Sequence, residues 1–121
     1  MNKNIAILGA SPKEDRYANM CQKSLVEKGF EVFPINPVYE QIDGKKCYKS
    51  LIDITEDIDT ITVYMNADRF NKIYEEVITK KPLRIIFNPG TESDEIKNKL
   101  LLEKIEVVEA CTLVMLKTGQ F

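Results

Sequence analysis

Histidine does not occur anywhere in the 121 residues. Its absence removes the commonest general base and the commonest metal ligand of proteins, and it leaves a nucleophilic cysteine without its usual basic partner. The three cysteines are widely spaced, so neighbours in sequence form neither a disulfide framework nor a C-x-x-C metal pair. We therefore expect reduced thiols, no metal site, no catalytic residues and no enzyme activity of the chain's own.

Long apolar runs and long basic runs are also missing. No apolar stretch approaches the ~20 residues of a membrane span, and residues 5–10 are too few for the apolar segment of a signal peptide. With a net charge of −2, the chain lacks the dense lysine and arginine that general nucleic-acid binding requires. These absences predict a cytoplasmic protein that contacts neither a membrane nor nucleic acid.

What is present fits one globular domain over residues 1–121, with 44% hydrophobic and 30% charged residues. Apolar and β-branched runs alternate with segments of helical periodicity. That alternation is typical of a three-layer α/β sandwich, in which helices cover both faces of a five-stranded parallel sheet. The expected strands are 4–8, 31–36, 59–64, 83–87 and 105–108, and the expected helices are 16–28, 70–78 and one that begins after Thr91 or Ser93.

Apolar spacing indicates which faces of two helices are buried. In the first helix the stripe is Tyr17, Met20, Cys21, Leu25 and Val26, which makes Cys21 a core residue. In the second it is Phe70, Ile73, Tyr74, Val77 and Ile78. Residues 38–50 are expected to be a polar connection. Residues 51–54 fit a short helix or a turn, and residues 113–116 fit a terminal helix or an edge strand.

The turn after the first strand, Gly9-Ala10-Ser11-Pro12, is the strongest functional signal. Small residues let a ligand approach the backbone, and the N-terminus of the following helix attracts an anion. The dinucleotide motif G-x-G-x-x-G is incomplete, because Ser11 and Glu14 stand at its second and third glycine positions. An ordinary tight turn and a phosphate site both fit, and Arg16 fits a phosphate clamp or a surface charge.

In a doubly wound sheet, ligands bind at the carboxyl ends of the strands, where the strand order reverses. That rule selects the turns 9–16, 36–39, 64–67 and 87–90. The second strand ends in Asn36-Pro37, where an NAD-binding unit usually has an Asp or Glu for the ribose hydroxyls. A neutral side chain tolerates a phosphate on the adenosine ribose, so the sequence weighs against NAD.

Four segments together resemble the small stand-alone CoA-binding domain proteins, which are similar in fold to the N-terminal CoA-binding domain of the succinyl-CoA synthetase α subunit. They are Gly9-Ala10-Ser11-Pro12-Lys13, residues 29–37 with Pro34-Ile35-Asn36-Pro37, residues 44–51, and Phe87-Asn88-Pro89-Gly90. The resemblance extends from Ile5 to Cys111. It implies a Rossmann-like five-stranded parallel sheet that binds coenzyme A at the strand ends.

The resemblance also implies a set of ligand-binding positions. Gly9, Ala10 and Ser11 would lie against the diphosphate with Lys13 and Arg16 as nearby cations; Asn36 and Pro37 would border the adenosine; and Tyr64, Met65, Asn66, Asn88, Pro89 and Gly90 would line the rest of the nucleotide and the start of the pantetheine arm. Members often have Lys or Arg directly after the Asn-Pro pair, whereas this chain has Val38. Lys45 or Lys46 is the candidate replacement for recognition of the ribose 3′-phosphate. Cys111 fits either core packing or the mouth of the ligand site.

We interpret the chain as a non-catalytic protein that binds coenzyme A or an acyl-CoA. Two alternatives remain: a sensor of NAD(P) or another nucleotide on the same scaffold, and a partner-dependent subunit of an enzyme like an acyl-CoA ligase or synthetase. A second copy of the chain and an enzyme subunit are the candidate protein partners.

Overall fold

The computed structural model describes residues 3–121, and five parallel strands form its central sheet. The order across the sheet is β2-β1-β5-β6-β7. The strands are β1 (Asn4–Leu8), β2 (Glu31–Ile35), β5 (Thr60–Val63), β6 (Arg84–Phe87) and β7 (Glu106–Glu109). The predicted parallel sheet is confirmed, and each strand begins and ends within one residue of its expected position.

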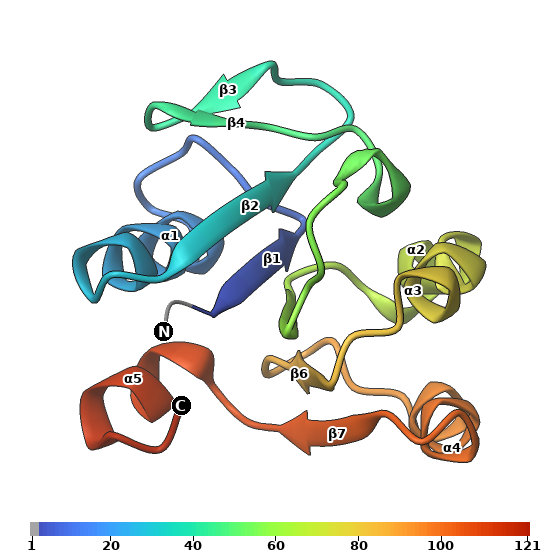
Figure 1. Ribbon diagram of the computed structural model, residues 1–121. Helices are drawn as coiled ribbons and strands as arrows, with labels where there is room; N and C mark the ends of the chain where they lie inside the picture. The colour runs from blue at the N-terminus through green and yellow to red at the C-terminus, as the bar shows by residue number, and fades with distance from the viewer. Residues whose placement is uncertain (1–2) are drawn as a thin grey trace.

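Helices cover both faces of the sheet and complete three layers (Figure 1). One face packs against α1 (Tyr17–Glu27) and α5 (Thr112–Thr118). The other packs against α2 (Ala67–Lys72), α3 (Tyr74–Lys80), α4 (Asp94–Leu102) and the short 3₁₀ helix η1 (Leu51–Asp53). Of the two segments that the sequence left undecided, residues 51–53 form η1 and residues 113–116 lie within α5.

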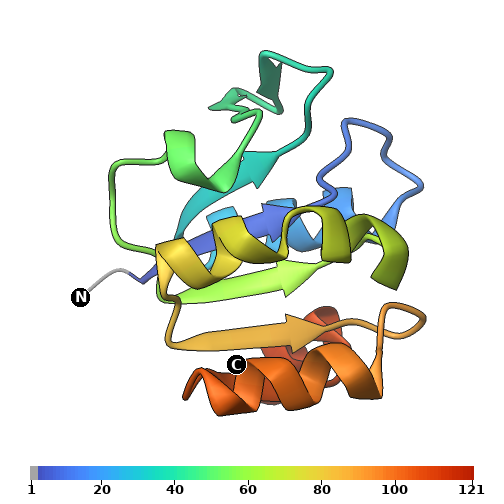
Figure 2. The same cartoon turned by 90° about the vertical axis from the view of Figure 1, so that its right-hand side faces the viewer.

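The strand order reverses beside β1. β1 pairs with β2 on one side and with β5 on the other, so the chain leaves β2 and returns across β1. Figure 2 shows the arrowheads of the sheet strands at one edge, where the following loops project together. At this carboxyl edge the loops after β1 and β5 are neighbours, and the N–H of Tyr64 donates to the carbonyl of Leu8 at 2.8 Å.

Gly9 is required by the approach of these two loops. Its φ is +83°, which side chains of L-residues rarely adopt. A Cβ atom built on Gly9 would lie 2.7 Å from the carbonyl oxygen of Tyr64, closer than any normal contact. The glycine of the turn is thus set by backbone packing, whether or not a ligand is present.

Two expectations about helices are wrong. Residues 70–78 do not form one helix, because the N–H of Ile73 bonds the carbonyl of Phe70 in a tighter turn and separates α2 from α3. In α1, Cys21 and Leu25 are buried as expected, whereas Tyr17, Met20 and Val26 are exposed.

In place of those apolar residues, the buried face of α1 carries the side-chain amides of Asn19 and Gln22. Both amides bond a hairpin formed by β3 (Gln41–Ile42) and β4 (Lys45–Lys46). This hairpin lies within residues 38–50, which were expected to be a polar connection. Gln22 donates from Nε2 to the carbonyl of Ile42 at 2.9 Å. The hairpin turns at Asp43-Gly44, both with positive φ, and Asp-Gly is a preferred pair for such turns.

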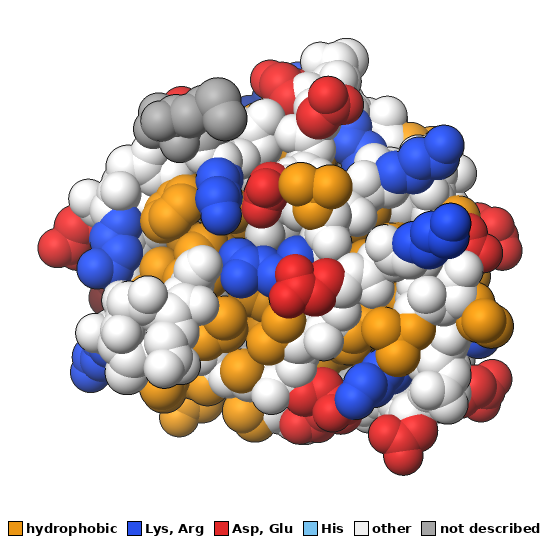
Figure 3. Space-filling model, turned by 60° about the horizontal axis from the view of Figure 1, so that its bottom comes forward, with side chains coloured by type: hydrophobic (Ala, Val, Ile, Leu, Met, Phe, Trp, Pro, Cys, Tyr) orange, Lys and Arg blue, Asp and Glu red, His pale blue; other side chains and the backbone are white. Residues whose placement is uncertain are grey.

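The surface is mixed in character. On the face drawn in Figure 3, lysine and arginine side chains lie among hydrophobic and acidic ones. None of the helices within residues 3–121 is long and apolar enough to cross a membrane.

Replacing Gly9 by alanine is expected to lower the free energy of unfolding by about 2 kcal/mol or more, through left-handed backbone strain and the contact with Tyr64. Gly29→Ala is the matched control, because Gly29 also has positive φ (+90°) but open space around it. That variant is expected to lose only about 1 kcal/mol. Urea unfolding measures both, and equal losses would contradict the role given to Tyr64.

Candidate functional site

Three adjoining hollows lie along the carboxyl edge of the sheet. The cationic hollow, about 280 Å³, is lined by Leu8, Ile35, Asn36, Pro37, Met65, Lys49, Arg69 and Lys72 among others. The turn hollow, about 390 Å³, is lined by Gly9, Ala10, Ser11, Lys13, Arg16, Tyr39 and their neighbours. The apolar hollow, about 580 Å³, is lined by Tyr17, Met20, Pro89, Cys111, Leu113, Val114 and their neighbours.

The turn hollow lies between the other two. It shares Gly9, Asn36 and Arg69 with the cationic hollow. It shares Tyr17 and Tyr64 with the apolar hollow. The three hollows therefore form a row along this edge, with neighbouring hollows sharing lining residues.

The N-terminus of α1 faces the turn hollow without a cap. No side chain caps it, its first turn contains no acid, and among residues 3–121 no acceptor bonds the N–H of Tyr17 or Ala18. By contrast, α2 and α4 are capped by Asn66 and Ser93 and have acidic first turns. Unbonded N–H groups and the helix dipole favour an anion at the start of α1.

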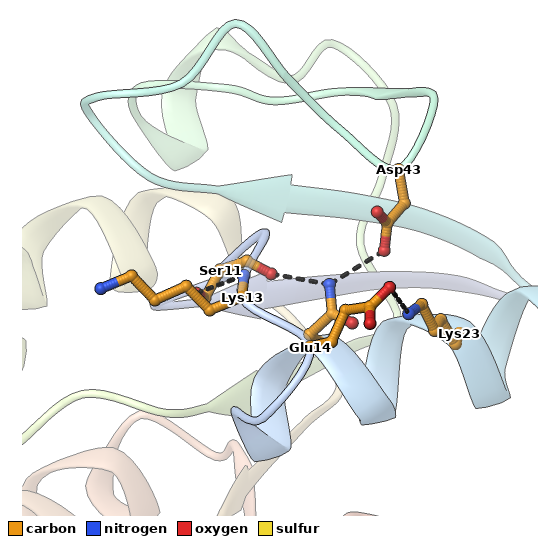
Figure 4. A network of polar contacts seen from close by, with 6 residues as sticks. Ser11, Lys13, Glu14, Lys23 and Asp43 are labelled. Carbon is orange, nitrogen blue, oxygen red and sulfur yellow. Dashed lines mark hydrogen bonds and ion pairs between the residues drawn. The ribbon is translucent and has the colours of Figure 1, made fainter.

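Ser11 has a hydroxyl proton to give. Its Oγ accepts the N–H of Lys13 at 3.1 Å, which orients the hydroxyl and leaves its hydrogen available for a ligand oxygen. Figure 4 shows the Lys13 side chain extending away from Asp43 and Lys23. Lys13 and Arg16 thus add positive charge beside N–H and O–H donors, a combination that suits phosphate oxygens.

Side-chain amides hold the turn from both sides. Nδ2 of Asn19 donates to the carbonyl of Ser11 and to Oδ2 of Asp43, both at 2.9 Å, so that the hairpin is tied to the turn (Figure 4). On the other side, Nδ2 of Asn36 donates to the carbonyl of Ala10 at 2.9 Å. The turn is therefore fixed before any ligand binds.

Asn88 has a structural role within the site. It is 3% exposed, and its Nδ2 donates to Oγ1 of Thr62 at 2.7 Å and to the carbonyl of Val63 at 2.9 Å. Its Oδ1 accepts the N–H of Thr112 at 2.8 Å. These bonds join β5, β6 and the start of α5, and they leave the amide little capacity for a ligand.

Burial governs the ionisation of one thiol, Cys21, and one phenol, Tyr64. Burial raises the pKa of the Cys21 thiol to about 11, so Cys21 is an inert core residue as expected. Burial also raises the pKa of Tyr64, whose hydroxyl has no hydrogen-bond partner within the described residues. Cys111 is half-buried and lines the apolar hollow.

Most of the positions implied by the resemblance come together in the three hollows. Those that line them are Gly9, Ala10, Ser11, Lys13, Arg16, Asn36, Pro37, Tyr64, Met65, Asn88 and Pro89. Asn66 and Gly90 line none of the three. Asn66 caps α2 by accepting the N–H of Arg69 at 2.9 Å, and the N–H of Gly90 donates to Glu92 at 2.8 Å.

Sequence reasoning missed three cations of the cationic hollow, Lys49, Arg69 and Lys72. Arg69 and Lys72 are three residues apart on a helix that starts at the carboxyl edge, a spacing that could have identified them. Neither Lys45 nor Lys46 lines any of the three hollows, and Lys46 lies over the Tyr48 ring at 4.9 Å.

The chain is similar in sequence to proteins that are already known. A family model described as a CoA binding domain matches residues 3–117. An ADP-forming acetate–CoA ligase of Methanocaldococcus jannaschii is 38% identical over 74 residues, 61% of this chain and 10% of the ligase. ADP-forming acetate–CoA ligase I of Archaeoglobus fulgidus is 32% identical over 109 residues, 88% of this chain and 16% of that ligase. The chain thus spans a small part of the ligases that it matches.

The fold has close structural counterparts. A crystal structure described as that of an uncharacterized protein has a TM-score of 0.93 and 38% sequence identity, and the match covers 100% of this chain and 99% of the other. The similarity to small chains of the same extent and to parts of ligases agrees with the resemblance seen in the sequence.

Asn88→Ala is expected to lower the free energy of unfolding by about 3 kcal/mol, because it removes three buried hydrogen bonds and leaves the N–H of Thr112 without an acceptor. The matched control, Asn66→Ala, removes one exposed helix cap and is expected to cost about 1 kcal/mol. Urea unfolding of both variants provides the comparison. A loss at Asn88 no larger than that at Asn66 would argue against the structural role.

Stability is expected to fall between pH 9 and pH 11, in part through Cys21. The folded chain keeps this thiol protonated up to about pH 11, whereas the unfolded chain releases the proton near pH 9. Within that window, the difference in protonation of Cys21 lowers the free energy of unfolding by up to about 1.4 kcal/mol per pH unit. Cys21→Ala should make the fall measurably shallower in urea titrations, and an unchanged slope would exclude this contribution.

Proposed function

Because the chain belongs to the CoA binding domain family, we propose that it binds coenzyme A or an acyl-CoA and performs no chemistry of its own. In this proposal the diphosphate lies against Gly9, Ala10 and Ser11 and faces the N-terminus of α1. The whole chain, residues 1–121, acts as one binding domain. Its three free thiols fit a reducing cytoplasm.

The order of the three hollows supports coenzyme A as the ligand. Coenzyme A has an adenosine with a 3′-phosphate at one end, a diphosphate in the middle and a pantetheine arm with its thiol at the other end. The turn hollow, with unbonded N–H groups and the cations Lys13, Arg16 and Arg69, is in the middle. The apolar hollow suits the pantetheine arm, and the cationic hollow suits the adenosine end.

The observation that carries the proposal is the uncapped start of α1. The N–H groups of Tyr17 and Ala18 have no acceptor within residues 3–121, at the point where Ser11 and Lys13 offer further donors. A diphosphate would bond these groups and interact favourably with the helix dipole.

A partner-dependent role in an acyl-CoA ligase is the second candidate, and the matches to ADP-forming acetate–CoA ligases favour it. Since this chain spans 10% and 16% of those ligases, it would supply only the CoA-binding part. A pull-down that recovers a ligase-like subunit, with CoA-dependent ligase activity of the mixture and none of the chain alone, would support this role. Recovery of a second copy alone would support a homo-oligomer.

Thermal unfolding with a ligand panel tests the proposal. CoA at a hundred times its dissociation constant should stabilise the fold by about 2.7 kcal/mol and raise the melting temperature by several degrees. Ser11→Asp should abolish this shift, because a carboxylate would stand beside the phosphates, while the melting temperature without ligand stays nearly unchanged.

Ser24→Asp is the control, since it adds the same charge near the other end of α1. It should keep the full response to CoA. A response retained by Ser11→Asp would remove the turn from the site. A larger stabilisation by NADH or NADP⁺ than by CoA would instead assign the scaffold to a dinucleotide.

A further inference from the structure

The cationic hollow is lined by three cations and one acid. Lys49, Arg69 and Lys72 line it, and the ion pairs found within residues 3–121 involve none of them. Glu76 is the one acid among the lining residues, and it accepts a hydrogen bond from Oγ of Ser50 at 2.6 Å. In a chain of net charge −2, this local excess of cations is suited to an anion.

The same hollow has an apolar floor. Leu8, Ile35, Pro37 and Met65 come from the ends of β1 and β2 and from the loops after β2 and β5. An apolar floor with cations around it suits a planar base and ribose that carry a phosphate. The apolar hollow at the other end has Lys117 as its only charged lining residue and lacks this combination.

From this arrangement we infer that Lys49 and Lys72 bind the ribose 3′-phosphate of coenzyme A, with Arg69 at the boundary between this phosphate and the diphosphate. The inference rests on the proposed function. It places the phosphate-binding cations on the loop before η1 and on α2, whereas the position after Asn36-Pro37 holds Val38, which is 75% exposed and uncharged.

The assignment to two lysines follows from where each cation lies. Arg69 lines both the cationic and the turn hollow, so it reaches either phosphate group. Lys49 and Lys72 line the cationic hollow alone among the three. Both lysines are exposed, so their replacement leaves the core intact.

Isothermal titration with CoA and with dephospho-CoA, which lacks the 3′-phosphate, tests the inference. The wild-type chain should bind CoA at least tenfold more tightly than dephospho-CoA. Lys49→Gln combined with Lys72→Gln should weaken CoA binding about tenfold and change dephospho-CoA binding less than twofold, since each lost phosphate contact is charge-assisted. Lys45→Gln combined with Lys46→Gln is the control with the same change of charge, and it should leave both affinities unchanged.

The outcomes separate this inference from the proposed function. If CoA and dephospho-CoA bind equally well, or if the preference for CoA survives in the Lys49/Lys72 variant, the 3′-phosphate site is wrong while CoA binding stands. If neither molecule binds, both fail. If NADP⁺ binds more tightly than CoA and NAD⁺, and the variant loses that binding, the hollow recognises a 2′-phosphate and the 3′ assignment is overturned.

Discussion

The backbone of Gly9 packs against the carbonyl of Tyr64 with no room for a side chain between them. This contact joins the loops after β1 and β5. These are the two neighbouring strands between which the strand order of the sheet reverses. The turn that begins at Gly9 leads to the start of α1, and this contact fixes its first residue against the loop after β5. The middle of the candidate site is thus a consequence of how closely two backbones approach.

Asparagine side chains complete this frame. Asn19 and Asn36 bond consecutive carbonyls of the turn from opposite sides, and Asn88 connects β5, β6 and the start of α5. Their amide nitrogens donate to oxygen atoms within the protein. The groups best placed to bind an anion are the backbone N–H donors, the Ser11 hydroxyl and the cations. The site separates residues that fix its shape from residues that would contact an anion.

The sheet was predictable because its strands are short runs rich in apolar and β-branched residues, and the turn was predictable because small residues follow the first strand. The buried face of α1 could not be predicted from apolar spacing. Its residues Asn19 and Gln22 are buried because they bond a hairpin that lies about 20 residues further along the chain. The break at Ile73 follows a local tightening that apolar spacing does not report. Lys49 and Lys72 meet only through the fold, so their common hollow could not be seen in the sequence.

Because the N-terminus of α1 has no cap, ligand binding and folding stability are coupled there. If phosphate oxygens bond the N–H groups of Tyr17 and Ala18, the ligand acts as the missing helix cap and becomes part of the folded state. A molecule that binds only the folded chain multiplies the folding equilibrium constant by one plus the ratio of the ligand concentration to Kd, so a higher ligand concentration means a smaller unfolded fraction. Inside a cell, the lifetime of this chain against proteolysis would then rise and fall with the supply of the metabolite that it holds.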